Sequence, residues 1–503
     1  MRILIAFSFL LLSAATLAQT PESYRHWDPL SRTGKRMLSI RGEHAHIRPL
    51  SPFLEADAIA QTPDSLLNDS TGFNYMPRLV ADVSGGASIY PSPGASGYGG
   101  LGFAIHSTIR NRFYAQAGYQ LHYLYFPDHL QVFANQRGII PGVGESFKIG
   151  EMHAAHYYTG SVGVRMGDHF TFDAGRDKHF WGNGYRSMIL SHNAAPMWYG
   201  KLTTKVWKLK YVNLWSALDA APLDPLNPGW RRSFLTSHAL SWNISPRWNL
   251  TFYESVVWQA QDTLSERGFD ASYLNPFIFY RPVEFSQGSA DNVLLGMELS
   301  FEATDKAEFY GQLYFDEFLL YELRRREGWW GNKYGLQLGA KAHDLFVDSL
   351  SMQTELNVVK PFTYTHGSVA QAYGTSYQSL AHPLGTNFVE WITRAAYERP
   401  NSTLRGTLII AGYGDDQEGL NYGGDVFTSY ANPWRQFGNS LMQGEKNTLI
   451  YLHAELSKPL PFLDLHAFTA GHLRKVNNSL NAPFDTWIQV GIRSSLVSPY
   501  RDF

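Results

Sequence analysis

The sequence predicts an all-β fold: a transmembrane antiparallel β-barrel of about 18 strands with long extracellular loops. Three observations lead to this class. Apolar and polar side chains alternate through most of the chain, short and long connections follow each other in turn, and no apolar run long enough for a membrane helix follows the first segment. Aromatic residues form 15% of the 503 residues and charged residues 17%, a composition that excludes an intrinsically disordered protein.

Residues 1–18 predict a secretory signal peptide. Arg2 precedes an apolar stretch, and Thr16 and Ala18 form the small-x-small pattern of a cleavage site. The chain contains no cysteine, so disulfides and thiolate metal sites are excluded, although a signal peptide directs the chain to an oxidising compartment. Lys and Arg total 42 against 44 for Asp and Glu, so no basic field indicates a nucleic-acid partner.

Residues 19–78 are polar, are interrupted by proline and show no strand periodicity. We expect a periplasmic leader or plug segment here, with a helix around 53–59, that caps the lower mouth of the barrel. The barrel itself is expected to occupy 79–503.

The clearest alternation with period two lies in 157–166, 351–358 and 449–457. In the second of these segments, the face that carries Met352 is aliphatic and the face that carries Glu355 is polar. A polar inner face beside an apolar outer face suits a membrane barrel.

The same template, applied along the chain, gives an even number of strands, as single-chain bacterial barrels require. We place these strands at 79–90, 98–109, 112–125, 152–166, 169–177, 201–207, 210–218, 234–244, 247–258, 291–302, 306–319, 334–343, 350–360, 386–397, 402–413, 448–458, 461–473 and 486–496.

The connections test the barrel independently. Short ones such as 110–111 and 167–168 are rich in Asn, Asp, Gly or Pro, which are turn residues. A soluble sandwich or propeller also has alternating strands, but regular alternation of short and long connections favours the barrel. The long connections are 126–151, 178–200, 219–233, 259–290, 320–333, 361–385, 414–447 and 474–485.

Four runs in the loops carry a family resemblance. They are GRDKHFWGNGYRS at 175–187, NPFIFYRPVEFSQGSADN at 275–292, AHPLGTNFVE at 381–390 and GNSLMQGEKN at 438–447. These runs resemble the Wzi family of capsule-assembly outer-membrane proteins, especially its gliding-motility relatives of the RemB type. The resemblance implies an eighteen-stranded barrel in the bacterial outer membrane, with loops exposed at the cell surface. It further implies a lectin that anchors capsular or secreted exopolysaccharide and does not conduct it.

The loop residues themselves suit sugar binding, because aromatic faces stack on C–H surfaces and Arg, Asn and carboxylate groups hydrogen-bond hydroxyls. The run Arg324, Arg325 and Arg326 would suit an acidic polymer. The candidate polysaccharide-binding residues are Arg176, Asp177, Trp181, Tyr185, Arg186, Asn193, Trp198, Trp230, Arg281, Glu284, Trp329, Trp330, Trp434 and Arg435.

Structural roles compete with binding at these positions. A tryptophan at a strand end also fits an interfacial girdle. Arg176 and Asp177 also fit an ion pair on the lumen wall that holds an infolded loop. Gly182 and Gly184 permit a tight reversal of the chain.

No catalytic or metal constellation stands out. Ser191, His192 and Asn193 are adjacent and cannot face one another as nucleophile and base. We therefore expect no enzyme activity, no cofactor and no metal. We also expect a monomer whose partners are extracellular polysaccharide and outer-membrane lipid. A surface adhesin for gliding motility and a substrate-specific porin remain the alternative functions.

Overall fold

The computed structural model describes residues 44, 46–47, 73–90, 94–110, 112–125, 128–220, 231–261, 267–276, 291–417, 419–461, 465–477, 484–494 and 502. These residues form a closed antiparallel β-barrel of 18 strands, which confirms the predicted fold class. Each barrel strand pairs with the next along the chain, and β1 pairs with β23 to close the ring. Closure leaves no open edge in the barrel sheet, so each of the 18 barrel strands has a backbone partner on both sides.

The barrel strands are β1 (Phe73–Tyr90), β2 (Gly94–Ile109), β3 (Phe113–Tyr125), β7 (Met152–Met166), β8 (Phe170–Asp177), β9 (Met197–Val206), β10 (Leu209–Ala220), β11 (Arg231–Ser245), β12 (Trp248–Gln259), β13 (Asn292–Thr304), β14 (Ala307–Phe315), β15 (Tyr334–His343), β16 (Leu350–Val359), β19 (Phe388–Arg399), β20 (Ser402–Asp415), β21 (Glu445–Pro459), β22 (His466–Asn477) and β23 (Asp485–Arg493).

Smaller elements lie in the connections. They are α5 (Asp128–Arg137), α7 (Leu320–Arg325), the 3₁₀ turns η2 (Ala271–Leu274) and η3 (Val369–Gln371), and the short strands β4 (Ile139–Ile140), β5 (Gly144–Glu145), β6 (Phe147–Ile149), β17 (Gly374–Thr375) and β18 (Gln378–Ser379). In the part of the chain that the structure describes, no helix is both long and apolar enough to cross a membrane.

The alternation predicted from the sequence separates two chemically different faces. On β16, Glu355 and Gln353 are only 1% and 2% exposed and point inward, whereas Leu356 is 39% exposed and points outward. On β23, Ile488 and Val490 point outward, at 49% and 56% exposure. The outer wall is therefore apolar and the inner wall polar.

Several strand boundaries differ from the prediction by three to six residues. β1 begins at Phe73 instead of residue 79. β22 begins at His466 instead of residue 461, where proline has no backbone N–H to donate to a ladder. β14 ends at Phe315, earlier than predicted, because the carboxylate of the following Asp316 accepts from the Tyr364 backbone N–H at 2.7 Å.

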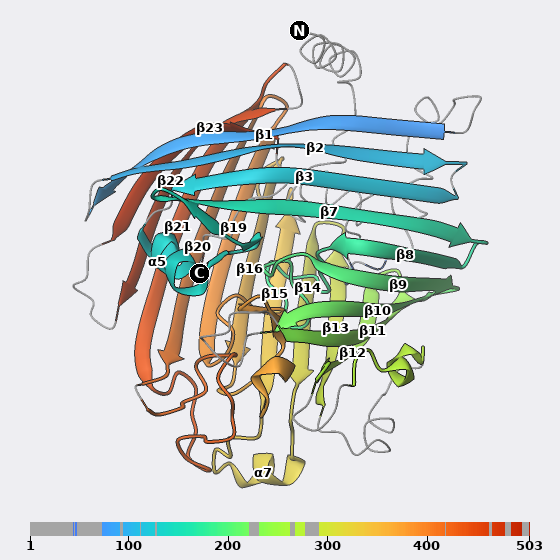
Figure 1. The fold of residues 1–503 in the computed structure, drawn as a ribbon, viewed down its shortest axis with the longest axis vertical. Helices are drawn as coiled ribbons and strands as arrows, with labels where there is room; N and C mark the ends of the chain where they lie inside the picture. Colours follow the sequence, from blue (N-terminus) through green and yellow to red (C-terminus); the bar gives the residue numbers. More distant parts are fainter. Residues whose placement is uncertain are drawn as a thin grey trace.

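Long connections gather at one end of the barrel and short turns at the other (Figure 1). Several long loops also turn inward. Leu130 and Ala134 of α5 pack with the inward-facing Tyr157 and Leu124 of the wall in one buried cluster. The loops thus reach the lumen, where they contact the side chains of the inner wall.

Candidate functional site: an occluded lumen beneath an aromatic loop surface

The connection between β8 and β9 folds into the lumen as a plug, defined here as residues 178–196. Trp181 is 2% exposed, and its backbone N–H donates to the carbonyl of Leu190 at 2.8 Å, which closes a loop within the plug. Gly182 has φ of 141°, and a Cβ there would lie 2.4 Å from Nε2 of Gln312. Only glycine fits this reversal against the wall, as the sequence indicated.

Side chains of the wall accept the backbone N–H groups of the plug. Oε1 of Glu298 on β13 accepts from Asn183 at 2.8 Å. The carboxylate of Glu355 on β16 accepts from Tyr185 at 2.7 Å and from Arg186 at 3.1 Å. A buried carboxylate that accepts several N–H groups makes strong charge-assisted bonds, so the wall fixes the conformation of the plug tip.

Arg186 lies at the centre of a buried charge network. Its side chain is 0% exposed and lies 3.6 Å from the carboxylate of Glu390 and 3.3 Å from that of Asp502. His382 approaches the other oxygen of Glu390, with Nε2 and Oε2 2.6 Å apart. Burial lowers the pKa of His382, against the opposing influence of Glu390. The plug and the 360–387 loop thus meet on one β19 carboxylate, and Asp502 joins the network through Arg186.

Both ends of the described chain contact the plug. The hydroxyl of Tyr185 donates to the carboxylate of Asp502, next to the C-terminus. At the other end, the carbonyl of His46 accepts from the Gly182 N–H at 2.7 Å, and Ile47 forms an isolated bridge with Trp181. These contacts bring residues 46–47 and 502 into the lumen. Residues 73–78 of the predicted 19–78 leader belong to β1, and the helix predicted around 53–59 lies outside the described residues.

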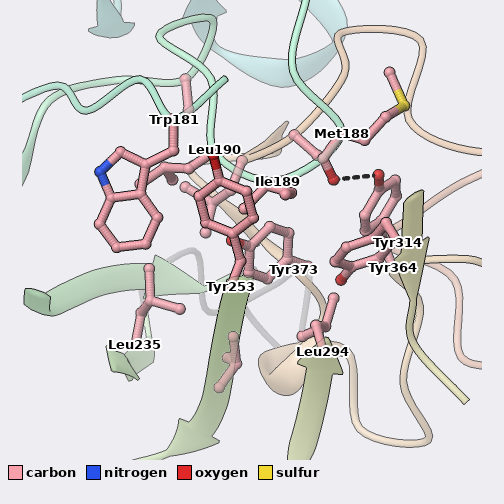
Figure 2. Packing of buried hydrophobic residues seen from close by; sticks show 14 of the residues in the cluster. Trp181, Met188, Ile189, Leu190, Leu235, Tyr253, Leu294, Tyr314, Tyr364 and Tyr373 are labelled. Atoms are coloured by element: carbon pink, nitrogen blue, oxygen red, sulfur yellow. Dashed lines mark hydrogen bonds between the residues drawn. The ribbon is translucent and has the colours of Figure 1, made fainter. Parts of the chain in front are cut away.

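One flank of the plug is apolar. Figure 2 shows Trp181, Met188 and Ile189 packed among aromatic and aliphatic side chains of the wall and of a neighbouring loop. Trp181 stacks on Tyr253 with ring centroids 6.0 Å apart, and the hydroxyl of Tyr364 donates to the Met188 carbonyl at 2.6 Å. The plug therefore combines an apolar core with satisfied backbone groups, as a folded protein interior does.

Neighbouring loops tie to the plug from above. The ammonium of Lys178 donates to the carbonyl oxygens of Gly142 and His192, the latter at 3.0 Å. Burial lowers the pKa of Lys178 to about 7, despite the opposing effect of Asp177. The Ser191 N–H donates to the carbonyl of Leu380 in the 360–387 loop at 2.7 Å. Three long loops thereby form one cover over the lumen.

A separate surface forms where the 316–333 and 416–444 loops pair. The N–H of Asn439 donates to the Gly328 carbonyl at 2.9 Å, and the N–H of Trp330 to the Gln436 carbonyl at 3.1 Å. The same pairing bonds Nε1 of Trp330 to the side chain of Gln436 at 2.8 Å. Asn439 belongs to the 438–447 run noted in the sequence, so that run helps to hold the two loops together.

This pairing creates the Trp–Arg surface, defined as Trp329, Trp330, Trp434 and Arg435. The Arg435 guanidinium lies 3.8 Å from the centroid of the Trp434 ring, and Tyr422 packs against that ring at 4.8 Å. Trp329 and Trp330 lie 6.0 Å apart between centroids. Arg435 is exposed and the three tryptophans are partly exposed, so the surface offers aromatic faces beside a cation.

The fourteen candidate residues fall into distinct places. Four form the Trp–Arg surface just described. The plug contains Trp181, Tyr185, Arg186 and Asn193, all buried or partly buried. Asn193 donates to the Ser379 carbonyl at 2.8 Å, so its amide is engaged within the loop cover.

The other six candidates do not gather with these groups. Trp198 is 54% exposed on the outer face of β9, the position of a girdle residue. Arg176 also points outward, 4.0 Å from the Tyr158 ring centroid, whereas Asp177 accepts from Gln116 at 3.2 Å on the inner side. The predicted Arg176–Asp177 ion pair is therefore wrong, because neighbours in a strand point to opposite faces. Trp230, Arg281 and Glu284 lie outside the described residues. A binding role stays a prediction for all fourteen.

Sequence reasoning missed the residues that hold the plug. Glu298, Gln312 and Glu390 were not singled out, although each lies inward on a strand whose apolar and polar residues alternate. Gln312 accepts from the Met188 N–H at 2.9 Å. A charged or amide residue at an inward position was the available signal, but its loop partner could not be deduced from period alone.

Comparisons with known proteins support the architecture. No protein-family model and no curated protein sequence matches the chain. Among solved structures, the chain is similar to Wzi of Escherichia coli, described as an outer-membrane, carbohydrate-binding β-barrel involved in group 1 capsule assembly. The identity is 13%, 90% of each chain is covered, and the TM-score is 0.51.

Two porins are also similar. OprD of Pseudomonas aeruginosa has 10% identity and a TM-score of 0.44, with 83% of this chain and 94% of that chain covered. A BenF-like porin of Pseudomonas fluorescens Pf-5 has 8% identity and a TM-score of 0.46, with 85% and 98% covered. At these identities the similarity to Wzi establishes the barrel fold.

Proposed function

We propose that this protein is an outer-membrane β-barrel lectin that binds an extracellular polysaccharide through its long loops and anchors that polymer at the cell surface. The apolar outer wall supports insertion in a membrane: Leu338 and Phe309, on neighbouring strands, are 52% and 53% exposed. In this arrangement the long loops face the outside of the cell and the short turns face the periplasm.

The occluded lumen carries the proposal. Inward-facing Glu298, Gln312 and Glu355 are at most 1% exposed because they bind the plug. A transport function needs polar wall groups that are free to exchange partners with a solute, and these groups are committed to the chain itself. Among the described residues, we therefore expect the ligand on the outer side of the loops.

The Trp–Arg surface has the chemistry that such a ligand requires. Aromatic rings bind the C–H faces of sugars, and a guanidinium makes paired hydrogen bonds to a carboxylate. The resemblance of the loop runs to the Wzi family, together with the shared barrel fold, supports capsular or secreted exopolysaccharide as the ligand.

The direct test is retention of acidic and neutral polysaccharides on purified protein in detergent or nanodiscs. We expect Trp434→Ala to weaken binding by up to about tenfold, because an aromatic contact of this kind contributes roughly 0.5–1.5 kcal/mol. Trp207→Ala is the matched control: Trp207 is 78% exposed in a short turn at the opposite end of the barrel. Equal binding by both variants and the parent would contradict the assignment to this surface.

Conductance separates the lectin from a porin. In planar bilayers we expect the native protein to show no stable open channel, because the plug blocks the lumen. Regular single-channel steps in the native protein, together with no retention of any polysaccharide, would favour the porin instead.

A further inference from the structure

Helix α7 is a surface element with no buried residue on any side. Its six residues follow β14, and Leu319 precedes them without a side-chain cap. Leu320 and Tyr321 are 50% and 68% exposed, and Leu319 and Leu323 are 52% and 39% exposed. A helix this short is marginal in water unless an apolar face is covered, so its environment must supply that cover.

The apolar residues continue the outer wall of the barrel. On β14, Tyr314 is 2% exposed and points inward, so its neighbour Phe315 points outward on the face that carries Phe309. Phe318 packs against Phe315 with ring centroids 4.9 Å apart. The chain therefore leaves β14 on the outer side, and α7 lies among the long loops at the edge of the molecule (Figure 1).

Three arginines, Arg324 to Arg326, lie at the end of α7 or directly after it. Arg325 is already engaged, by Glu327 at 2.7 Å and Glu322 at 3.5 Å. Arg324 and Arg326 are exposed, and neither forms an ion pair with another residue in the described part of the chain. Arg324 follows Leu320 by four positions, which places both on one face of a helix.

We propose that α7 lies in the surface of the lipid leaflet on the long-loop side, with its leucines at the acyl boundary and Arg324 and Arg326 on the phosphates of anionic lipids. Continuity with the lipid-facing wall selects lipid as the occupant, and the exposed guanidinium groups of Arg324 and Arg326 select an anionic headgroup. Long cationic side chains beside leucines also match the way interfacial arginines extend toward headgroups. This inference rests on the proposed insertion of the barrel in a membrane and is independent of the ligand bound by the loops.

The absence of native cysteine permits a site-specific depth measurement. Leu320→Cys, labelled with a nitroxide, is reconstituted in vesicles of phosphatidylcholine alone or mixed equally with phosphatidylglycerol. Collision with oxygen, which concentrates in lipid, is compared with collision with a water-soluble nickel complex. Leu338→Cys on the outer wall provides the lipid reference, and Gln417→Cys in an exposed loop provides the water reference.

We expect the label at 320 to resemble the label at 338 more than the label at 417, most clearly in the anionic vesicles. We also expect Arg324→Gln and Arg326→Gln each to reduce the preference for phosphatidylglycerol about fivefold, measured with spin-labelled lipid. Arg137→Gln is the control, because Arg137 lies at the same end of the barrel but is paired with Asp425 at 3.3 Å.

Nickel accessibility at 320 equal to that at 417 in both vesicles would overturn the proposal. So would protection at 320 that develops only when acidic polysaccharide or an acidic protein is added. A label at 338 that is exposed to water would overturn membrane insertion as well. Polysaccharide retention by the Arg324→Gln/Arg326→Gln variant reports separately on the lectin, so failure of one proposal is distinguishable from failure of the other.

Discussion

The plug should open when its strongest anchor on the wall is removed. Glu355→Ala deletes the acceptor of two backbone N–H groups, those of Tyr185 and Arg186, and of the Tyr310 hydroxyl at 2.8 Å. Hydrogen bonds to a charged group contribute about 1.5–3 kcal/mol each, so the two backbone bonds together contribute about 3–6 kcal/mol. Water that enters the space replaces part of these hydrogen bonds. We therefore expect Glu355→Ala to lower the free energy of plug opening by about 3 kcal/mol, the lower end of the range.

Hydrogen exchange measures this loss directly. About 3 kcal/mol corresponds to exchange on the order of 100-fold faster at the Tyr185 and Arg186 amides. The same variant should conduct intermittently in planar bilayers, because the plug opens without unfolding the barrel.

Gln353→Ala is the matched control for this experiment. Gln353 is 2% exposed, lies two residues away on the same inner face, and hydrogen-bonds Tyr310 and Arg394 instead of the plug. If Glu355→Ala and Gln353→Ala exchange these amides at the same rate, the wall carboxylate does not anchor the plug.

Three further perturbations test other parts of the assembly. Arg186→Met should lower the free energy of unfolding by about 3–5 kcal/mol, because it leaves buried Glu390 without its guanidinium partner. It should lower the melting temperature far more than Asp502→Asn, which removes one carboxylate charge that is 10% exposed. Equal melting temperatures for the two variants would contradict the network. Gly182→Ala should open the plug, because its φ is 141° and a Cβ would lie 2.4 Å from Gln312, while Gly268→Ala, at φ 61° with open space around it, should leave plug exchange unchanged. Burial, aided by Lys333, lowers the pKa of His366 to about 4. The opened loop then binds the proton more readily than the closed loop, so closure is fully stable above pH 6.5 and loses about 2 kcal/mol by pH 5. Exchange in the 360–387 loop at the two pH values measures this loss. His366→Gln should reduce the difference, and the part that remains reports on His382, whose pKa burial also lowers.

The predicted barrel was accurate because strand alternation is a local property. A strand that faces lipid on one side and a polar lumen on the other must alternate with period two, so Met352 and Glu355 reveal their faces without any knowledge of neighbouring strands. Turn chemistry between strands then gave the order and the number of strands. Two of the deviations occur where proline or a loop partner bounds a ladder, at β22 and at Asp316.

The candidate site was predicted less completely. The sequence marked the 175–187 run as special and marked Trp329, Trp330, Trp434 and Arg435 as loop residues with suitable chemistry, but it did not separate the two groups. Backbone pairing of Gly328 with Asn439, more than one hundred positions apart, unites the second group. Such pairing depends on loop geometry, and loops show no periodic sequence pattern from which it could be predicted.

By itself the sequence determined an apolar exterior, a polar interior and the order of the strands, because these follow from residue spacing along single strands. Only the tertiary structure decided that the interior is filled. The acceptors for the plug N–H groups come from β13, β14 and β16, while Arg186 meets Glu390 on β19 and Asp502 at the end of the chain. Closing the barrel brings these distant groups together around one loop, and the energy of burying each depends on the presence of the others.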